Sequence, residues 1–169
     1  LDLLHVPRLT NWKNDRNLAH QIAAHPAQYS EDDVRAWLLR NSADQHQVLL
    51  GIFDQQDQEV IGVARLMFID WISQVAELGV FIGDFAARGR RRGQEAVGLL
   101  LKHAFMDLGL ERVYLRVMSD NLPAMRCYEA CGFVREGTLR SHFVSEGARY
   151  DMLVMGILRN QYLVEYAGQ

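Results

Sequence analysis

The chain has 169 residues, of which 49% are hydrophobic and 23% charged, and its formal net charge is −3 at pH 7. This length and composition fit one globular domain. General nucleic-acid-binding domains are basic overall, and a membrane span needs about 20 consecutive apolar residues, so both classes are disfavoured. No secretory signal pattern opens the sequence, and we expect a cytoplasmic domain that binds neither nucleic acid nor membrane.

The N-terminal part is predicted to be helical. Apolar residues spaced three and four apart indicate a helix over 10–25, which His25-Pro26 ends. Ser30 is a typical N-cap for a second helix, and acidic residues occupy its first turn. Those acids, Glu31, Asp32 and Asp33, could attract a basic substrate, although acids at a helix start need no such explanation.

From residue 47 the pattern changes to strands. Three β-rich segments joined by short polar links, with a hairpin turn at 54–57, predict an antiparallel meander. A long helix and a strand follow, and then a second helix that Asn121 caps and Gly132 closes. The last two strands pair around the turn "SEGA". The fold class is therefore α/β (α+β), a mixed and mostly antiparallel sheet flanked by helices. The predicted elements after 47 are strands 47–53, 59–69, 74–83, 112–117, 133–143 and 148–156 and helices 93–108 and 122–131.

Cysteine and histidine spacing does not indicate a metal site. Cys127 and Cys131 lie four residues apart, which is neither a zinc spacing nor a redox C-x-x-C motif. The six histidines are scattered without ligand-like partners. We therefore expect two small buried cysteines in a reducing compartment and no bound metal.

The segment "ARGRRRGQEAVGLLL" (86–100) concentrates positive charge at a predicted helix start. The helix dipole makes cations unfavourable there and anions favourable. Free backbone N–H groups, arginines and close-approaching glycines together form a typical phosphate-binding arrangement. Neither the Walker motif nor the G-x-G-x-x-G fingerprint is present. The segment predicts an anionic cofactor, the alternative being a solvated basic helix start.

Three blocks in one order, "AELGVFIGDFAARGRRRGQEAVGLLLKHAF", "LGLERVYLRVMSDNLPAMRCYEACGF" and "REGTLR", resemble the GNAT acyltransferases. The similarity is to the branch of spermidine N-acetyltransferases and ribosomal-protein N-terminal acetyltransferases, and it covers roughly residues 59–160. It implies one N-acetyltransferase domain over 1–169, with acceptor-side helices in 10–42, an acetyl-CoA-binding core in 59–132 and C-terminal strands in 133–160. The opening residues "LDLLHVPRLTNWKND" fall just past the place expected for the first strand of the family, and whether that strand is missing, disordered or divergent is left open.

The resemblance implies acetyl-CoA as co-substrate. The pyrophosphate motif Q/R-x-x-G-x-G/A falls on 88–93, with Arg91 where its first glycine is usual. Arg91 could crowd the backbone cradle or reach a phosphate, and we favour the second. Val80, Phe81 and Ile82 would pair with the pantetheine arm like an added strand, and Asn121 would contact it. The predicted cofactor-binding residues are Val80, Phe81, Ile82, Arg88, Gly89, Arg90, Arg91, Arg92, Gly93, Asn121 and Ala124.

Acetyl transfer to an amine requires an unprotonated amine and a proton for the departing thiolate. An alkyl amine with a pKa near 10.4 is only about 0.04% neutral at pH 7. Glu77, on the strand face opposite Ala76 and Leu78, is the candidate base, and a cross-strand carboxylate is the alternative. Tyr128 matches the general acid of the family, and a core tyrosine is the alternative. Cys127 as a covalent nucleophile is disfavoured because nothing activates it.

The expected function is acetyl-CoA-dependent N-acetyl transfer to a primary amine by direct attack in a ternary complex. The amine could be a polyamine, a peptide N-terminus or another small amine, and a homodimer is possible. A non-catalytic acyl-CoA-binding regulatory module is the alternative that the substitution at Arg91 favours. A nucleic-acid binder is disfavoured by the net charge and by the lack of aromatic residues between the arginines.

Overall fold

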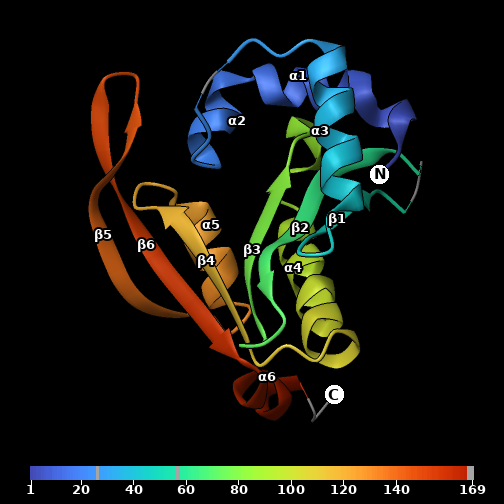
Figure 1. Ribbon diagram of the computed structural model, residues 1–169. Coiled ribbons are helices and arrows are strands. Elements are labelled where there is room, and N and C mark those ends of the chain that lie inside the picture. Colours follow the sequence, from blue (N-terminus) through green and yellow to red (C-terminus); the bar gives the residue numbers. More distant parts are fainter. Residues whose placement is uncertain (26, 56–57, 167–169) are drawn as a thin grey trace.

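A mixed six-stranded sheet runs through the molecule, whose computed structural model describes residues 1–25, 27–55 and 58–166 (Figure 1). The strand order is β1-β2-β3-β4-β6-β5, and every neighbouring pair except β3 and β4 is antiparallel. The predicted fold class is thus confirmed. The strands are β1 (Val48–Phe53), β2 (Val60–Asp70), β3 (Val75–Ile82), β4 (Arg112–Met118), β5 (Val134–Ser145) and β6 (Ala148–Leu158).

Helices cover both faces of the sheet (Figure 1). On one face, apolar residues of α1 and α3 pack with Val63 of β2. On the other, α4 and α5 pack on the main core, which includes Leu66, Leu78, Val97 and Tyr128. The helices are α1 (Val6–Asn14), α2 (Arg16–Gln21), α3 (Glu31–Ala43), α4 (Arg92–Lys102), α5 (Leu122–Glu129) and α6 (Arg159–Tyr166), with a π-helical turn at His103–Asp107 after α4.

Strands β3 and β4 separate soon after they meet. Their parallel pairing extends only over Val75–Glu77 of β3 and 112–114 of β4. Beyond that point β4 continues beside β6, while β3 stays with β2 up to Ile82. Within the described chain, one edge of β3 is therefore left without a strand partner after Glu77, and the sheet opens into a fork (Figure 1).

The N-terminal helix differs from its prediction. It begins at Val6 and ends at Asn14, and α2 follows after Asp15. The Asp15 carboxylate accepts the backbone N–H groups of Asn17 and Leu18 at 2.9 and 3.1 Å, so it caps a new helix and does not continue the first. Sequence analysis also did not anticipate α6 or the π-helical turn.

Several local predictions are confirmed. Ser30 caps α3 and forms a reciprocal capping box with Asp33. The β5–β6 turn contains Gly147 at φ 80°, a conformation that glycine adopts without strain. Parts of two predictions lie outside the described residues, namely Pro26 in the first helix end and residues 56–57 of the 54–57 turn.

Candidate active site

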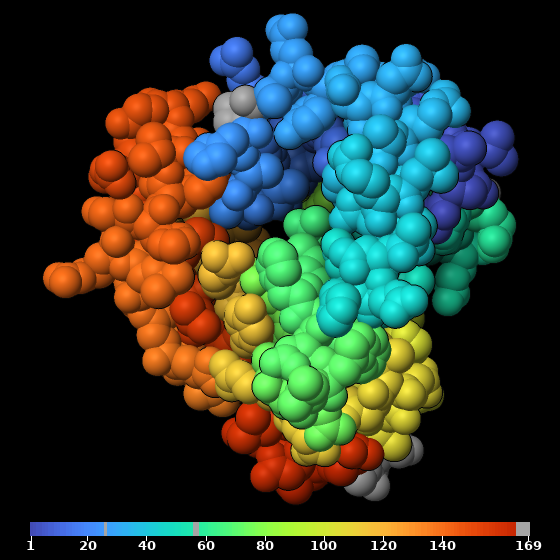
Figure 2. All heavy atoms as spheres, in the orientation of Figure 1, coloured from blue at the N-terminus to red at the C-terminus, as the bar shows by residue number. Residues whose placement is uncertain are grey.

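A cavity of ≈ 920 Å³ lies in the fork between β3 and β4. Figure 2 shows the surface hollowed between the blue N-terminal helices, the orange β5–β6 hairpin and the central strands. We call its two regions the cofactor end and the acceptor end. The cofactor end is lined by residues from the end of β3, the start of α4 and α5, among them Val80, Arg91, Gly93, Ala124 and Tyr128. The acceptor end is lined by residues that follow α2 and by β2 and the β5–β6 hairpin, among them Ile22, His25, Arg65, Met67, His142 and Phe143.

The start of α4 offers a backbone cradle for phosphate. Arg91 is the N-cap in left-handed conformation, with φ 59°, and makes no side-chain capping bond. The first N–H groups of a helix have no partner within the helix. In α4 they include the N–H of Gly93, the second residue of the helix, which lines the cavity. A Cβ atom on Gly93 would meet only ordinary contacts, at 3.9 Å from Cys127 Sγ. The room at Gly93 therefore fits a ligand approaching the backbone closely.

The four clustered arginines have different surroundings. Arg88 donates from Nε to the Ile82 carbonyl at 3.0 Å and from Nη2 to the Gly83 carbonyl at 3.5 Å, so it braces the end of β3. Arg92 forms an ion pair with Asp54. Arg90 does not line the main cavity but a separate one of ≈ 610 Å³ between β1 and α4, away from its predicted place. Arg91 lines the main cavity, and its side chain has no hydrogen-bond or ion-pair partner among the described residues.

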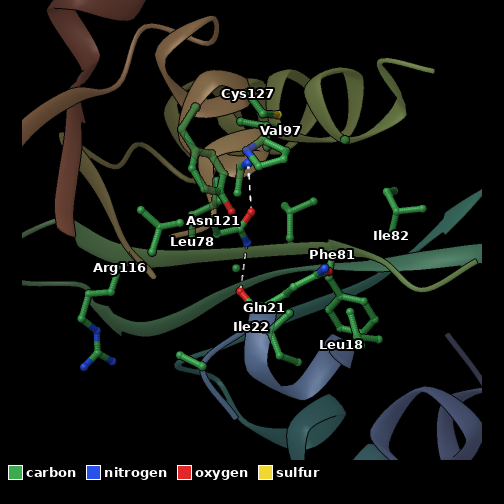
Figure 3. A pocket seen from close by; sticks show the side chains of 18 of the residues that line it. Leu18, Gln21, Ile22, Leu78, Phe81, Ile82, Val97, Arg116, Asn121 and Cys127 are labelled. Carbon is green, nitrogen blue, oxygen red and sulfur yellow. Dashed lines mark hydrogen bonds between the residues drawn. The ribbon is translucent and has the colours of Figure 1, made fainter. Parts of the chain in front are cut away.

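Asn121 joins the two ends of the cavity (Figure 3). Its side-chain oxygen accepts the backbone N–H of Ala124 at 3.2 Å, which confirms the predicted N-cap. Its amide nitrogen donates to the Gln21 carbonyl at the end of α2, also at 3.2 Å. A second link lies next to it, because His20 Nε2 is 3.0 Å from the Asp120 carboxylate. The segment after α2 is thereby attached to the start of α5 across the cavity.

Tyr128 lines the same cavity from α5 and is only 8% exposed. Its ring packs edge-on against Phe133, and its hydroxyl forms no hydrogen bond within the described parts of the chain. Burial raises the pKa of the Tyr128 phenol above its ordinary value, with the nearby Cys127 and Cys131 as smaller causes. A phenol of raised pKa is held protonated at neutral pH, as a proton donor requires.

Glu77 lies at the point where β3 and β4 diverge. As predicted, its side chain points away from the core that contains Ala76 and Leu78. Both of its carboxylate oxygens accept from Arg116 of β4, at 2.9 Å from Nε and 3.1 Å from Nη2. The bidentate pair uses one acceptor site on each oxygen, and each oxygen keeps a second one. The pairing alternative is thus present in the structure, and the role as base stays a prediction.

The family model described as "Acetyltransferase (GNAT) domain" matches residues 1–134. The chain belongs to the GNAT acetyltransferase family. It is 29% identical over 153 residues to spermidine N(1)-acetyltransferase of Vibrio cholerae, which covers 90% of this chain and 87% of that protein. The crystal structure of the Vibrio enzyme with CoA and spermine superposes with a TM-score of 0.90 at 28% identity, covering 96% of this chain and 95% of the other. A dodecameric structure of the same enzyme matches with a TM-score of 0.82.

Family membership makes this chain an N-acetyltransferase and confirms the expected resemblance. Arg65 of β2 and Arg116 of β4 are among the residues of this GNAT cavity that were not predicted from the sequence. Each is a charged residue inside a largely apolar strand segment. A charge in such a segment was the feature of the sequence that could have indicated a functional residue. Their meeting with Glu77 required knowledge of the strand order.

Other predicted groups of this acetyltransferase lie elsewhere or remain untested. Glu31, Asp32 and Asp33 lie at the start of α3 and do not line the cavity. Within the described ranges no three His, Cys, Asp or Glu residues gather as a metal site, and the expected lack of a metal stays a prediction. No described helix is both long and apolar enough to cross a membrane.

Proposed function

We propose that this GNAT chain acetylates a primary amine by direct attack within the single cavity of the sheet fork. The carrying observation is that one cavity includes the cradle at α4, the buried Tyr128 and the acceptor end. When both reactants bind in the same cavity, the amine can attack the acetyl group directly, and no covalent acetyl-enzyme intermediate is needed. Acetyl-CoA, when bound, supplies an activated acyl carbon.

The cofactor end supplies binding and orientation. The first N–H groups of α4 and the Arg91 guanidinium would hold phosphate oxygens. The unpaired edge of β3 at Val80, Phe81 and Ile82 offers main-chain groups to an extended amide-bearing arm, in the manner of strand addition. An N–H of this edge would also stabilise negative charge on the carbonyl oxygen that is attacked.

Tyr128 would donate its phenolic proton to the departing sulfur. Desolvation raises the pKa of Tyr128, and it also disfavours a charged thiolate in the same cavity. Proton transfer from the phenol to the thiolate exchanges one buried anion for another, so part of the desolvation cost cancels. The proton leaving the amine would pass to a free acceptor site of Glu77 or to water. Cys127 lies too far along α5 from the helix N-terminus to be activated by it.

The test of this mechanism compares Tyr128→Phe with the wild type. We expect a fall in kcat of about 10²-fold or more, the range of general acid catalysis, with the Kd of acetyl-CoA changed less than about twofold. Thiol release measures turnover, and calorimetry measures Kd. Equal turnover would remove Tyr128 from the mechanism. Tight acetyl-CoA binding with no turnover on any amine would favour a regulatory module.

We further propose a cytoplasmic homo-oligomer. The Vibrio cholerae relative forms a dodecamer. Light scattering after size exclusion tests this, and a monomer at micromolar concentration would contradict it.

A further inference from the structure

The acceptor end of the cavity is poor in negative charge. Glu77 is the only carboxylate among the described residues that line the whole cavity. Both of its oxygens are engaged by Arg116, so this pair is locally neutral. A second cation, Arg65, lines the cavity beside the pair.

Arg65 lies flat on the face of the sheet that carries Glu77. It faces Gly79 in the β2–β3 register, while its neighbour Met67 faces Glu77. A Cβ atom on Gly79 would lie 3.1 Å from Arg65 Nε, so the missing side chain of that glycine makes room for the arginine. Arg65 and Glu77 are thus diagonal neighbours, at about 7–8 Å between their backbones.

Arg65 has no counter-ion of its own. Within the described chain no carboxylate lies within ion-pair distance of it, and its closest charge of opposite sign already binds Arg116. Burial lowers the pKa of Arg65, which shows a guanidinium partly removed from water. Lys13 lies close enough for Arg65 to lower its pKa further, so positive charge repels positive charge here.

These surroundings oppose a polyamine. Spermidine and spermine carry an ammonium at every amine that is not reacting, and a second ammonium in the acceptor end would meet Arg65 with no free carboxylate to bind it. An anionic group in the same position would pair with the Arg65 guanidinium and relieve the repulsion with Lys13.

We propose that the acceptor is a small amine that also carries an anionic group, a carboxylate or a phosphate, and that Arg65 binds this group. The inference rests on the proposed N-acetyltransferase function and narrows its substrate class. Carboxylates and phosphates share the planar, bidentate recognition that arginine provides. Arg65 is in this view a specificity-determining residue of the acceptor end.

The first experiment measures kcat/KM by thiol release for amines that differ at one end only. γ-Aminobutyrate and putrescine form the main pair, O-phosphoethanolamine is the phosphate arm, and spermidine is the polyamine reference. We expect the anionic amines to exceed putrescine and spermidine at least tenfold, with the better of the two arms naming the anion. Preference for putrescine or spermidine would overturn the inference and leave the function standing. Acetylation of no amine would overturn both.

The second experiment tests Arg65 itself. Arg65→Met should raise KM for the preferred anionic amine about tenfold or more, leaving kcat and the KM of acetyl-CoA within about twofold. Arg65→Lys keeps the charge but lacks the bidentate guanidinium, so it should recover only part of the loss. Arg65→Glu should shift preference towards putrescine. Arg40→Met, an exposed arginine on α3 outside the cavity, is the charge-matched control. Thermal melts verify folding, and equal KM values in wild type and Arg65→Met would overturn the role of Arg65.

Discussion

Arg91 occupies a backbone conformation that glycine adopts more easily. Its φ of 59° lies in the left-handed region, which disfavours residues with a Cβ atom by about 1–2 kcal/mol. This explains why the motif has glycine as its usual residue there. From the sequence, Arg91 could crowd the backbone cradle or contact a phosphate. Its side chain is exposed and has no partner among the described residues, which favours phosphate contact.

We predict that Arg91→Gly raises the free energy of unfolding by about 0.5–1 kcal/mol. Glycine removes the backbone strain of the folded state, and this gain exceeds the cost of the greater freedom of the unfolded chain. The same variant should bind acetyl-CoA about tenfold more weakly, since a charge-assisted bond is lost. Urea denaturation and calorimetry measure the two effects. Arg91→Lys is the control that keeps both strain and charge. An unchanged Kd for Arg91→Gly would show that Arg91 does not contact phosphate.

Lys13 makes stability depend on pH. Burial, with Arg65 as the second cause, lowers its pKa from 10.5 to about 8. Between these values the unfolded state binds more protons than the folded state, so the free energy of unfolding rises with pH in that window. Below pH 8 the penalty of a charged, half-buried lysine is fully present.

Relative to Lys13→Met, the wild type should therefore gain stability as the pH is raised from about 8 towards 10.5. Urea denaturation of both proteins at several pH values measures the difference. Parallel curves for the two proteins would contradict the lowered pKa. Lys102→Met, on the solvent-exposed side of α4, is the matched control for the removal of a lysine charge.

The N-terminus of α5 has two separable roles, both carried by Asn121. Its oxygen caps α5, and its amide nitrogen holds the end of α2 across the cavity. Asparagine and aspartate cap helices about equally well, but only asparagine has the amide donor. Substitutions at this one residue can therefore separate the stability of a helix from the closure of the acceptor end.

We predict that Asn121→Ala lowers the free energy of unfolding by about 1 kcal/mol and that Asn121→Asp leaves it nearly unchanged. Both variants should raise the KM of the amine severalfold, because the segment after α2 is released. Chemical denaturation and steady-state kinetics measure these effects. A normal KM in Asn121→Asp would show that the bond to Gln21 has no part in acceptor binding.

The molecule as a whole is a sheet in two halves that meet at a short parallel contact. Only Val75, Ala76 and Glu77 of β3 pair with β4, and the Glu77–Arg116 ion pair lies at the end of this contact. The side chain of Glu77 is 8% exposed, whereas that of Arg116 is 37% exposed. The pair therefore links the two halves at the point where the cavity opens.

A double-mutant cycle with Glu77→Gln and Arg116→Gln tests this link. We predict a coupling of about 1–2 kcal/mol in the free energy of unfolding, as contacting charged residues show. The kinetics of Glu77→Gln then address its second role. A general base should lose kcat and flatten the pH–rate profile, whereas a purely structural residue would change stability alone. Additive effects on unfolding would contradict the link.

Much of the site was predictable because its signals are local. The N-caps Ser30 and Asn121 and the glycine turn at Gly147 follow from residue chemistry within a few positions. The break at Asp15 was missed because an aspartate inside a helical pattern is recognised as a cap only when its backbone conformation is known. Arg90 lines the cavity between β1 and α4 and not the main one, because neighbouring side chains at a helix start point in different directions.

By itself the sequence determined the order of the six strands, the helices α3, α4 and α5 and the placement of Tyr128 on a buried helix. These depend on periodicity, capping and spacing, which act over a few residues. Only the tertiary structure decided that Arg116 binds Glu77, 39 residues away, and that Asn121 holds Gln21 across 100 residues. The tertiary structure also decided that Arg65 lies beside the Glu77–Arg116 pair without a counter-ion in the described chain. Charges far apart in the sequence meet only when the strand order is set.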